Sequence, residues 1–304
     1  RMVIENILLA NEAGLGNGET PIFPIHIFKI KEGINYNPED INYDLFKLAC
    51  RVSAKRLFPN FSFIDAPFNL AFYKEGDVNT EVSYMGCRTR VLNNVADPNK
   101  TVTPGRGNLS FTSINLPRLG IKYGLPSGEV NLEGFYEELG EKLDLVKEQL
   151  LERFEIQCSR RVYNFPFLLG QGIWLDSDKL KDTDRLRKVL KHGTLTFGFI
   201  GLAECLIALT GKHHGEDKEA QKLGLEIVKF MRNRIDGYAS EHNLNFSLIA
   251  TPAEGLSGRF TNIDKAIYGK LKGMSEKDIL EKLDDLLKRF EISEYKNRKI
   301  KELS

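Results

Sequence analysis

Residues 107–116 read Gly-Asn-Leu-Ser-Phe-Thr-Ser-Ile-Asn-Leu, and their pattern indicates the fold class. A Pro-Gly-Arg-Gly turn precedes it, and its β-branched and aromatic residues predict a β-strand. Helices are expected between this strand and the others, which favours an α/β architecture, either layered or a barrel. The other predicted strands are 20–30, whose prolines suit an edge strand or a strand start, 61–65, 81–87 and 245–250.

Helical periodicity dominates the rest of the chain. One apolar stripe, spaced by four and three residues, predicts a long helix and consists of Phe135, Leu139, Leu143, Val146, Leu150 and Phe154. Four more helices are expected. They are 41–58, with Leu45, Leu48, Val52 and Ala54 near one face; 199–209, uniformly apolar and ended by Gly211; 218–234, amphipathic; and 275–287, with Ser275 and Asp278 in capping-box spacing.

The charge balance narrows the class of protein. Lys and Arg total 43 against 42 for Asp and Glu, which argues against a nucleic-acid or membrane-surface binder but allows a local cationic pocket. The sequence shows neither an apolar stretch of bilayer length nor a signal-peptide layout, so a soluble cytoplasmic protein is expected. GLGNGET (14–20) precedes a strand instead of opening a helix, which predicts a turn and not a dinucleotide loop.

The four cysteines are scattered, which indicates neither a disulfide framework nor a zinc ribbon, and no metal site is predicted. His213 and His214 are expected in a solvated turn. Cys50, Cys158 and Cys205 fit the common role of a small buried hydrophobe. Cys87 differs, because YMGCRTRV (84–91) places it where a strand enters a glycine-flanked turn; from spacing alone, a functional and a structural role carry equal weight.

Two further stretches could bind a ligand. A strand runs into ATPAEGLSGR (250–259), where free backbone amides and two hydroxyls could cradle a phosphate, although an ordinary capped turn would have the same pattern. It is not a Walker sequence. Asn108, after Arg106, could bind a substrate hydroxyl or carboxylate, or satisfy its own turn. Neither a Ser-His-Asp order nor a paired-carboxylate motif supports hydrolysis.

Six segments, in one order from about residue 2 to 267, resemble the catalytic subunit of the anaerobic (class III) ribonucleoside-triphosphate reductases, which are glycyl-radical enzymes. They are NGETPIFPIHIFKIKEGINYN, SAKRLFPNFSFID, YMGCRTRV, GRGNLSFTSINLPRLG, LKHGTLTFGFIGLAECLIALTGKHHGE and LNFSLIATPAEGLSGRF.

The resemblance implies part of a ten-stranded α/β barrel with the Cys87 loop as its central finger. The chain would be one catalytic-barrel piece over 1–304, strand-rich over 1–125 and helix-rich over 126–304. Cys87 would become the thiyl radical that removes the ribose 3′-hydrogen, and Asn108 would bind substrate hydroxyls or the co-substrate formate. The candidates for binding the substrate's phosphates are Thr251, Ala253, Glu254, Gly255 and Ser257.

The resemblance also implies what other parts must supply. The family's radical glycine, made by an S-adenosylmethionine-dependent iron–sulfur activating enzyme, and its four zinc cysteines have no counterpart in the sequence. Gly237, in a superficially similar Arg-Ile-Asp-Gly-Tyr stretch, is expected to cap a helix. The piece alone is therefore expected to be inactive. The expected partners are ribonucleoside triphosphates, the activating enzyme and a second copy of the full-length subunit, with neither nucleic acid nor membrane.

Two other functions stay open on the sequence. The chain could be a nucleotide-binding module or scaffold that needs a partner chain. It could also be a different glycyl-radical enzyme acting on a small acid, although the phosphate turn and Asn108 count against that. Base preference and its control by effectors are not encoded in any recognised motif.

Overall fold

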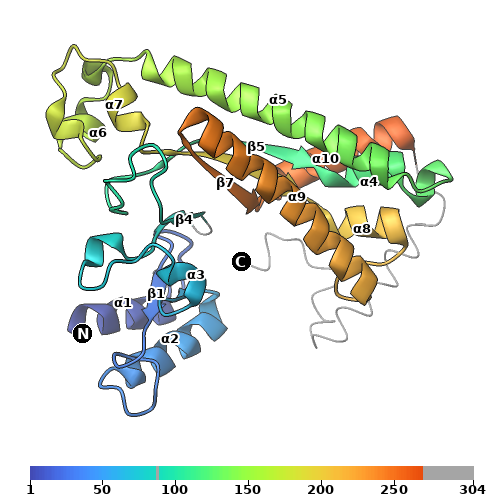
Figure 1. Cartoon of the computed structure of the whole chain (residues 1–304). Helices are drawn as coiled ribbons and strands as arrows, with labels where there is room; N and C mark the ends of the chain where they lie inside the picture. The colour runs from blue at the N-terminus through green and yellow to red at the C-terminus, as the bar shows by residue number, and fades with distance from the viewer. Residues whose placement is uncertain (87–88, 270–304) are drawn as a thin grey trace. The chain divides into compact units, whose positions relative to one another are not determined.

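The computed structural model describes residues 1–86 and 89–269, apart from the side chain of Glu254. The described residues form two compact units, Arg1–Asn93 with Thr101–Thr103, and Asn94–Lys100 with the chain from Pro104 onward (Figure 1). The predicted arrangement, one domain over 1–304 divided at residue 125, stays a prediction. The helix predicted over 275–287 lies outside the described residues.

The first unit is built on a short parallel strand pair. β1 (Ile27–Ile30) pairs with β2 (Asn60–Phe63), and α2 (Tyr43–Arg56) forms the crossover between them. The unit's core comprises Leu8, Phe28, Ile30, Leu45, Ala49 and Val52. The predicted helix over 41–58 and strand over 61–65 are thus present. Of residues 20–30 only the last four form a strand, and Ala54 is exposed rather than on the buried face of α2.

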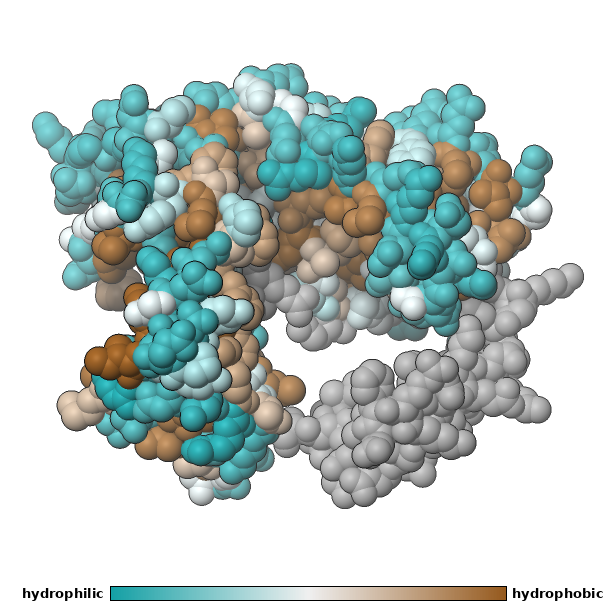
Figure 2. Space-filling view, turned by 60° about the horizontal axis from the view of Figure 1, so that its bottom comes forward, coloured by the Kyte–Doolittle hydropathy of each residue, from teal (hydrophilic) through white to brown (hydrophobic). Residues whose placement is uncertain are grey.

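The sequence analysis did not predict α1 (Met2–Ala13), which precedes this pair. Leu8 and Asn11 are its buried residues, whereas five large apolar side chains on it are well exposed: Met2, Val3, Ile4, Ile7 and Leu9. Figure 2 shows such apolar surface on the lower-left body among hydrophilic residues. α1 therefore adds little to the core beyond Leu8. The 14–20 stretch after it is a turn, as predicted.

A hairpin completes the first unit. β3 (Ser83–Met85) pairs antiparallel with β4 (Thr89–Val91), after α3 (Pro67–Leu70) and the 3₁₀ turn Val78–Thr80. Arg90 ties the hairpin to α3, because its Nη1 donates to Asn69 Oδ1 at 2.8 Å and its guanidinium lies 4.8 Å from the ring centroid of Phe68. The predicted 81–87 strand is confirmed over its central residues.

A three-stranded parallel sheet forms the second unit. β5 (Asn108–Asn115), β6 (Thr194–Ile200) and β7 (Asn245–Ala250) lie in that order, with Phe111, Thr196 and Ser247 in register. This confirms the α/β class and the strands predicted over 107–116 and 245–250. On the outer side of β5, Arg153 and Gln157 donate to the carbonyl oxygens of Phe111 and Leu109, each at 3.2 Å.

The central strand β6 corrects the sequence analysis. Residues 199–209 were expected to be one helix, but Phe199 and Ile200 end β6, and α8 (Leu202–Thr210) begins after Gly201, which adopts a left-handed conformation. Gly211 caps α8 with φ 83°, as predicted. The sequence Thr-Leu-Thr-Phe-Gly-Phe-Ile alternates with a period of two, which is the strand signal that the uniform apolarity of the region obscured.

Helices cover one face of the sheet. α5 (Leu132–Cys158) contacts β5 and β6, α9 (Lys218–His242) contacts β7, and α4 (Leu116–Tyr123) packs on α5 and α8 (Figure 1). The predicted stripe from Phe135 to Phe154 is buried on α5, where it meets Leu195 and Phe197 of β6 in one core. The short helices α6 (Pro166–Gly170) and α7 (Arg187–Leu190) follow α5, and α10 (Glu254–Tyr268) follows β7.

Gly237 is not the helix cap that the sequence analysis expected. α9 continues past it to His242 and is capped by Asn243 in a left-handed conformation, with φ 51°. Gly237 therefore lies in the exposed interior of α9, where an added Cβ would meet no atom within 4 Å.

Candidate functional site

The face of the sheet opposite α5 carries the candidate residues. Side chains alternate between the two faces along a strand. Leu195 and Phe197 lie in the helix-covered core, so Thr196 points to the opposite face, together with Ser247 in register beside it. Ser113, in register with Gly198, lies on that same face. We call this surface the open face, made of Phe111, Ser113, Thr196, Gly198, Ser247 and Ile249. Three of its six residues carry hydroxyl groups, and such groups can orient a polar ligand. Thr196 and Gly198, on the central strand, are themselves buried.

Asn108 lies at the amino-terminal end of β5, as predicted, with an exposed side chain. Its Oδ1 accepts a hydrogen bond from Thr196 Oγ1 at 3.0 Å, and Thr196 Oγ1 also lies 2.9 Å from Ser247 Oγ. One chain of polar contacts therefore crosses all three strands. Asn108 is bonded to Thr196 on the neighbouring strand β6, so it does not merely satisfy its own turn.

A second cross-strand contact lies nearer the carboxyl ends of the strands. Ser113 Oγ and Thr251 Oγ1 are 2.7 Å apart and meet above Gly198 of the central strand. A Cβ on Gly198 would stand 2.2 Å from Thr251 Oγ1 and 2.5 Å from Ser113 Oγ. Glycine is therefore required at this position, because any larger side chain would separate the two hydroxyls.

The turn after β7 has the geometry of an anion site. Thr251 N donates to Phe199 O at 2.9 Å, and Ala253 adopts a left-handed conformation (φ 55°, ψ 37°) that starts α10 at Glu254. The first amides of an α-helix have no acceptor within the helix and carry its positive dipole end, which favours a bound anion. Ligands of parallel α/β sheets bind beyond the carboxyl ends of the strands, where this turn lies.

A buried acid holds α10 against the end of β5. Asp264, on α10, is 8% exposed and accepts from Asn115 Nδ2 at 2.7 Å and from Arg118 Nε at 2.6 Å. Asn115 ends β5 and also caps α4. α10, α4 and the carboxyl end of the sheet are thus joined by side-chain hydrogen bonds.

The structure brings the predicted substrate residues onto one sheet but at two places along it. Thr251 lies against Ser113, whereas Asn108 is five residues earlier on β5. A bulge between Asn108 and Ser110 makes this four steps of the central strand, about 13 Å. Ala253, Glu254, Gly255 and Ser257 are in the turn and first helical turn at the same end as Thr251. The open face between the two places is what a ligand contacting both would have to span.

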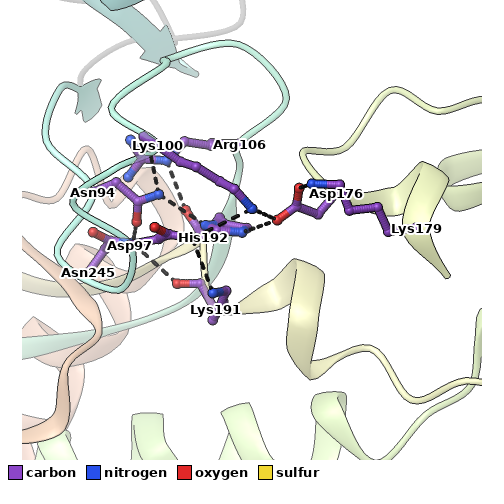
Figure 3. Close-up of polar contacts among 9 residues, drawn as sticks. All are labelled: Asn94, Asp97, Lys100, Arg106, Asp176, Lys179, Lys191, His192 and Asn245. Carbon is purple, nitrogen blue, oxygen red and sulfur yellow. Dashed lines mark hydrogen bonds and ion pairs between the residues drawn. The ribbon is translucent and has the colours of Figure 1, made fainter.

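A polar network lies at the amino-terminal end of the sheet, where β5 begins with Asn108 (Figure 3). His192 is 1% exposed, with its Nε2 3.0 Å from Asp176 Oδ2 and its Nδ1 3.0 Å from Asn94 Nδ2. Asp176 also binds Lys100 and Lys179. Asn245 Nδ2 donates to Asn94 Oδ1 at 3.1 Å, and Val95 N donates to Asn245 Oδ1 at 2.7 Å. The segment 94–100 is thereby fixed to the starts of β6 and β7.

The hydrogen bonds define the protonation of His192. Asn94 Oδ1 accepts from Asn245, so the Asn94 amide nitrogen faces His192 Nδ1, which must be the acceptor. Nε2 therefore carries the proton and donates to Asp176. Burial lowers the pKa of His192 despite the carboxylate beside it, which keeps the ring neutral. For Asp176, burial would raise the pKa, but the bonds from Lys100, Lys179 and His192 outweigh it and lower the pKa.

The network also fixes the chain just before Asn108. Arg106 Nε donates to His192 O at 2.9 Å, and burial lowers the pKa of Arg106 to about 10. Gly105 O accepts from Leu175 N at 2.8 Å, and a Cβ on Gly107 would lie 2.9 Å from the Trp174 ring. Sequence reasoning found neither this network nor the hydroxyls of Thr196, Ser247 and Ser113. The alternation along β6 was the one signal for Thr196.

Cys87 lies outside the described residues; in the sequence it follows Gly86, between the residues of β3 and those of β4. Of the other cysteines, Cys158 and Cys205 are buried, as expected, and burial raises the pKa of their thiols to about 11 and about 12. Cys50 is exposed, so its prediction as a buried residue was wrong. A lone cysteine at helical spacing does not reveal which helix face it occupies.

Other kinds of site find no support in the described part of the chain. Within 1–86 and 89–269, no three His, Cys, Asp or Glu side chains gather as metal ligands would. His213 and His214 lie in a turn, where His213 Nδ1 accepts from Gly215 N at 3.0 Å. Among the described helices, none is both long enough and apolar enough to cross a bilayer.

Solved structures support the fold. An anaerobic ribonucleotide reductase from Thermotoga maritima, with glycerol in its active site, matches with TM-score 0.58 at 14% identity, over 89% of this chain and 38% of that one. The same protein in complex with dATP and CTP matches with TM-score 0.56 at 15% identity, over 89% of this chain and 39% of that one.

Sequence relatives extend the match. The anaerobic ribonucleoside-triphosphate reductase of Escherichia coli is 30% identical over 281 residues, which are 91% of this chain and 38% of that protein. That of Enterobacteria phage T4 is 31% identical over 280 residues, 91% of this chain and 43% of that protein. The chain thus spans less than half the length of these relatives. The family model for anaerobic ribonucleoside-triphosphate reductase matches residues 1–298. The chain belongs to the anaerobic ribonucleoside-triphosphate reductase family.

Proposed function

We propose that this chain is the substrate-binding and thiyl-bearing core of an enzyme that reduces ribonucleoside triphosphates to deoxyribonucleoside triphosphates under anaerobic, cytoplasmic conditions. Family membership over residues 1–298 supports the reaction class. The observation that carries the proposal is the open face, where Asn108 and the turn at Thr251 lie on one parallel sheet. Such a face suits the interior of the ten-stranded barrel proposed here, with the β3–β4 turn as its finger loop.

Each candidate residue has a role in this proposal. Cys87 removes the ribose 3′-hydrogen as a thiyl radical, which activates the sugar for loss of its 2′-hydroxyl as water. Formate supplies the two electrons and leaves as carbon dioxide. Asn108 binds the sugar hydroxyls or formate, and the turn at 251–257 binds the phosphates. The amides of Gly255 and its neighbours at the start of α10 provide the donors that a phosphate needs.

Other parts must supply the rest of the chemistry. The radical would originate at a glycine generated by an S-adenosylmethionine-dependent iron–sulfur activating enzyme and stored outside this chain, and the full-length subunit would work as a homodimer. The zinc site implied by the family has no matching cluster of ligands among the described residues. We assign this chain nucleotide binding and hydrogen abstraction.

A charge substitution tests phosphate binding at the turn. Gly255 is exposed in the first turn of α10, and a Cβ added to it would have no atom within 4 Å, so side chains fit there. Gly255→Asp places a carboxylate beside the proposed phosphates and should weaken binding of CTP or ATP by about tenfold or more. Gly255→Asn, its neutral isostere, should bind nearly as wild type. An aspartate in a first turn favours the helix, so lost affinity would not come from unfolding.

Isothermal titration calorimetry with CTP or ATP measures the affinity of each Gly255 variant. Equal affinity of the Asp and Asn variants would remove the phosphates from this turn. Alkylation of Cys87 in the presence of each nucleotide gives an independent check on the substrate pocket. Protection at Cys87 but not at exposed Cys50 is expected, because a bound nucleotide would cover the pocket and leave α2 unchanged.

The alternative is a nucleotide-binding module or scaffold that needs a partner chain. It shares the phosphate turn but requires no chemistry at Cys87. Cys87→Ala in a complete, activated enzyme separates the two, because the proposed mechanism predicts loss of ribonucleotide reduction. Retained turnover would remove Cys87 from the reaction and leave the binding function.

A further inference from the structure

We propose that Thr196 and Ser247 are positioning residues that hold the side-chain amide of Asn108 with both N–H groups directed outward. The site at Asn108 would then take a hydrogen-bond acceptor, either a carboxylate oxygen or a sugar hydroxyl oxygen. This rests on the proposed function in one respect, that Asn108 lies on the substrate side of the sheet. The orientation itself depends only on three side chains from three strands.

The number of available hydrogens sets the direction of the contacts. Thr196 has one hydroxyl proton, and its Oγ1 lies 3.0 Å from Asn108 Oδ1 and 2.9 Å from Ser247 Oγ. A carbonyl oxygen can only accept, so the Thr196 proton points to Asn108. The contact with Ser247 must then use the serine proton. The resulting relay runs in one direction, from Ser247 to Thr196 to Asn108.

Burial makes these hydrogen bonds costly to lose. Thr196 is 1% exposed and lies on the central strand, so water cannot replace either partner of its hydroxyl. Asn108, in contrast, is exposed at the start of β5. Its oxygen is occupied by Thr196, and the part of the amide left for a ligand is the NH₂ group with its two donors.

The backbone before Asn108 supports the same orientation. Arg106 Nε donates to His192 O at 2.9 Å, and Gly107 O accepts from Thr194 N, also at 2.9 Å. The chain therefore enters β5 along a fixed path immediately before the asparagine. The side-chain amide is then free only to flip, and in the structure its oxygen faces Thr196.

Asparagine-selective labelling with ¹³Cγ and ¹⁵Nδ2 tests the orientation by NMR, with Asn108→Asp identifying the signal. Thr196→Val removes the relay hydroxyl at nearly constant volume, and should shift the Asn108 ¹³Cγ resonance away from its hydrogen-bonded position. Thr196→Ser keeps the hydroxyl and should restore it. Ser247→Ala leaves the Thr196 donor in place and should give a smaller shift; it also serves if the valine variant does not fold.

Two results would overturn the orientation. Either Thr196→Val leaves the Asn108 signals unmoved, or it releases the Nδ2 protons and not the carbonyl, which would mean that the amide faces the other way. No ligand is needed for this measurement. A failed Gly255 experiment would therefore refute phosphate binding and leave the relay intact, and the reverse also holds.

Ligand titrations test the acceptor. Sodium formate and CTP, added separately, are the two oxygen sources, and the one that shifts the Asn108 Nδ2 protons identifies which of them binds there. Thr196→Val should weaken that binding by about three- to tenfold, the worth of one oriented hydrogen bond, and Thr196→Ser should recover it. If neither probe moves the Nδ2 protons, the assignment of an acceptor at Asn108 is wrong.

Discussion

Gly198→Ala should unfold the sheet unit more easily because its methyl group has no space on the open face. The new Cβ would lie 2.2 Å from Thr251 Oγ1 and 2.5 Å from Ser113 Oγ, whereas ordinary contacts begin near 3.4 Å. Either the strands separate or both hydroxyls turn away and lose their 2.7 Å contact. Overpacking costs about 1–3 kcal/mol and the lost hydrogen bond about 0.5–1.5 kcal/mol.

The Gly→Ala change itself stiffens the unfolded chain, which returns about 0.4–1 kcal/mol. The expected net loss in free energy of unfolding is therefore about 0.5–4 kcal/mol. Gly237→Ala is the matched control, because that glycine is exposed in the interior of α9 with no atom within 4 Å of a Cβ. It makes the same chemical change and should stabilise by about 0.5–1 kcal/mol.

Urea unfolding followed by circular dichroism, under reducing conditions, measures both variants. Their midpoints should move in opposite directions from wild type. Adding Ser113→Ala and Thr251→Ala to Gly198→Ala removes the clashing oxygens and should recover part of the loss. A Gly198→Ala midpoint equal to or above that of wild type would refute the reasoning, as would a triple variant less stable than the single one.

Three further predictions concern titration, an ion pair and the thiols. Burial lowers the pKa of His192 below its unfolded value of 6.5, so its contribution to stability is complete above that pH and falls as the pH drops below it. The urea midpoint should therefore decline more steeply from about pH 7 to pH 5 in wild type than in His192→Gln. Equal slopes would count against a neutral ring. Asp264→Ala leaves the Arg118 guanidinium without its carboxylate and should destabilise α10 by about 1–3 kcal/mol, seen as faster amide hydrogen exchange in α10 than in α5; unchanged exchange would contradict the anchoring role. Iodoacetamide at neutral pH should label Cys50 and spare Cys205, whose buried thiol has a pKa of about 12, and peptide mass spectrometry showing equal labelling would contradict that burial.

The sequence predicted those elements whose pattern has one explanation. The stripe on α5 follows a single helical period over more than five turns. The prediction of its buried face was therefore confirmed at every named position. Asn108 at a strand start and the turn after β7 were also placed correctly, because glycine, proline and a strand pattern coincide there.

The errors have physical causes. β6 lies between helices and is buried on its core side, so its apolar residues merged with those of α8 into one apparent helix. Gly237 resembles a cap, but helix α9 tolerates an exposed glycine at small cost and ends only where Asn243 turns left-handed. The relay from Ser247 to Asn108 depends on the pairing of strands far apart in the chain, and strand order cannot be read from local patterns.

The two edge strands of the sheet, β5 and β7, are not equivalent, and the difference affects which of them can pair with a further strand. Arg153 and Gln157 of α5 occupy outward carbonyls of β5, so that margin is partly blocked to another backbone. The described residues supply no such bond to β7, and neither strand carries a charged side chain that would repel an incoming strand. Addition of a further strand is therefore favoured beside β7. A chain purified alone should self-associate through the outer edge of β7 as its concentration rises. A charged residue introduced on β7 should keep the chain monomeric.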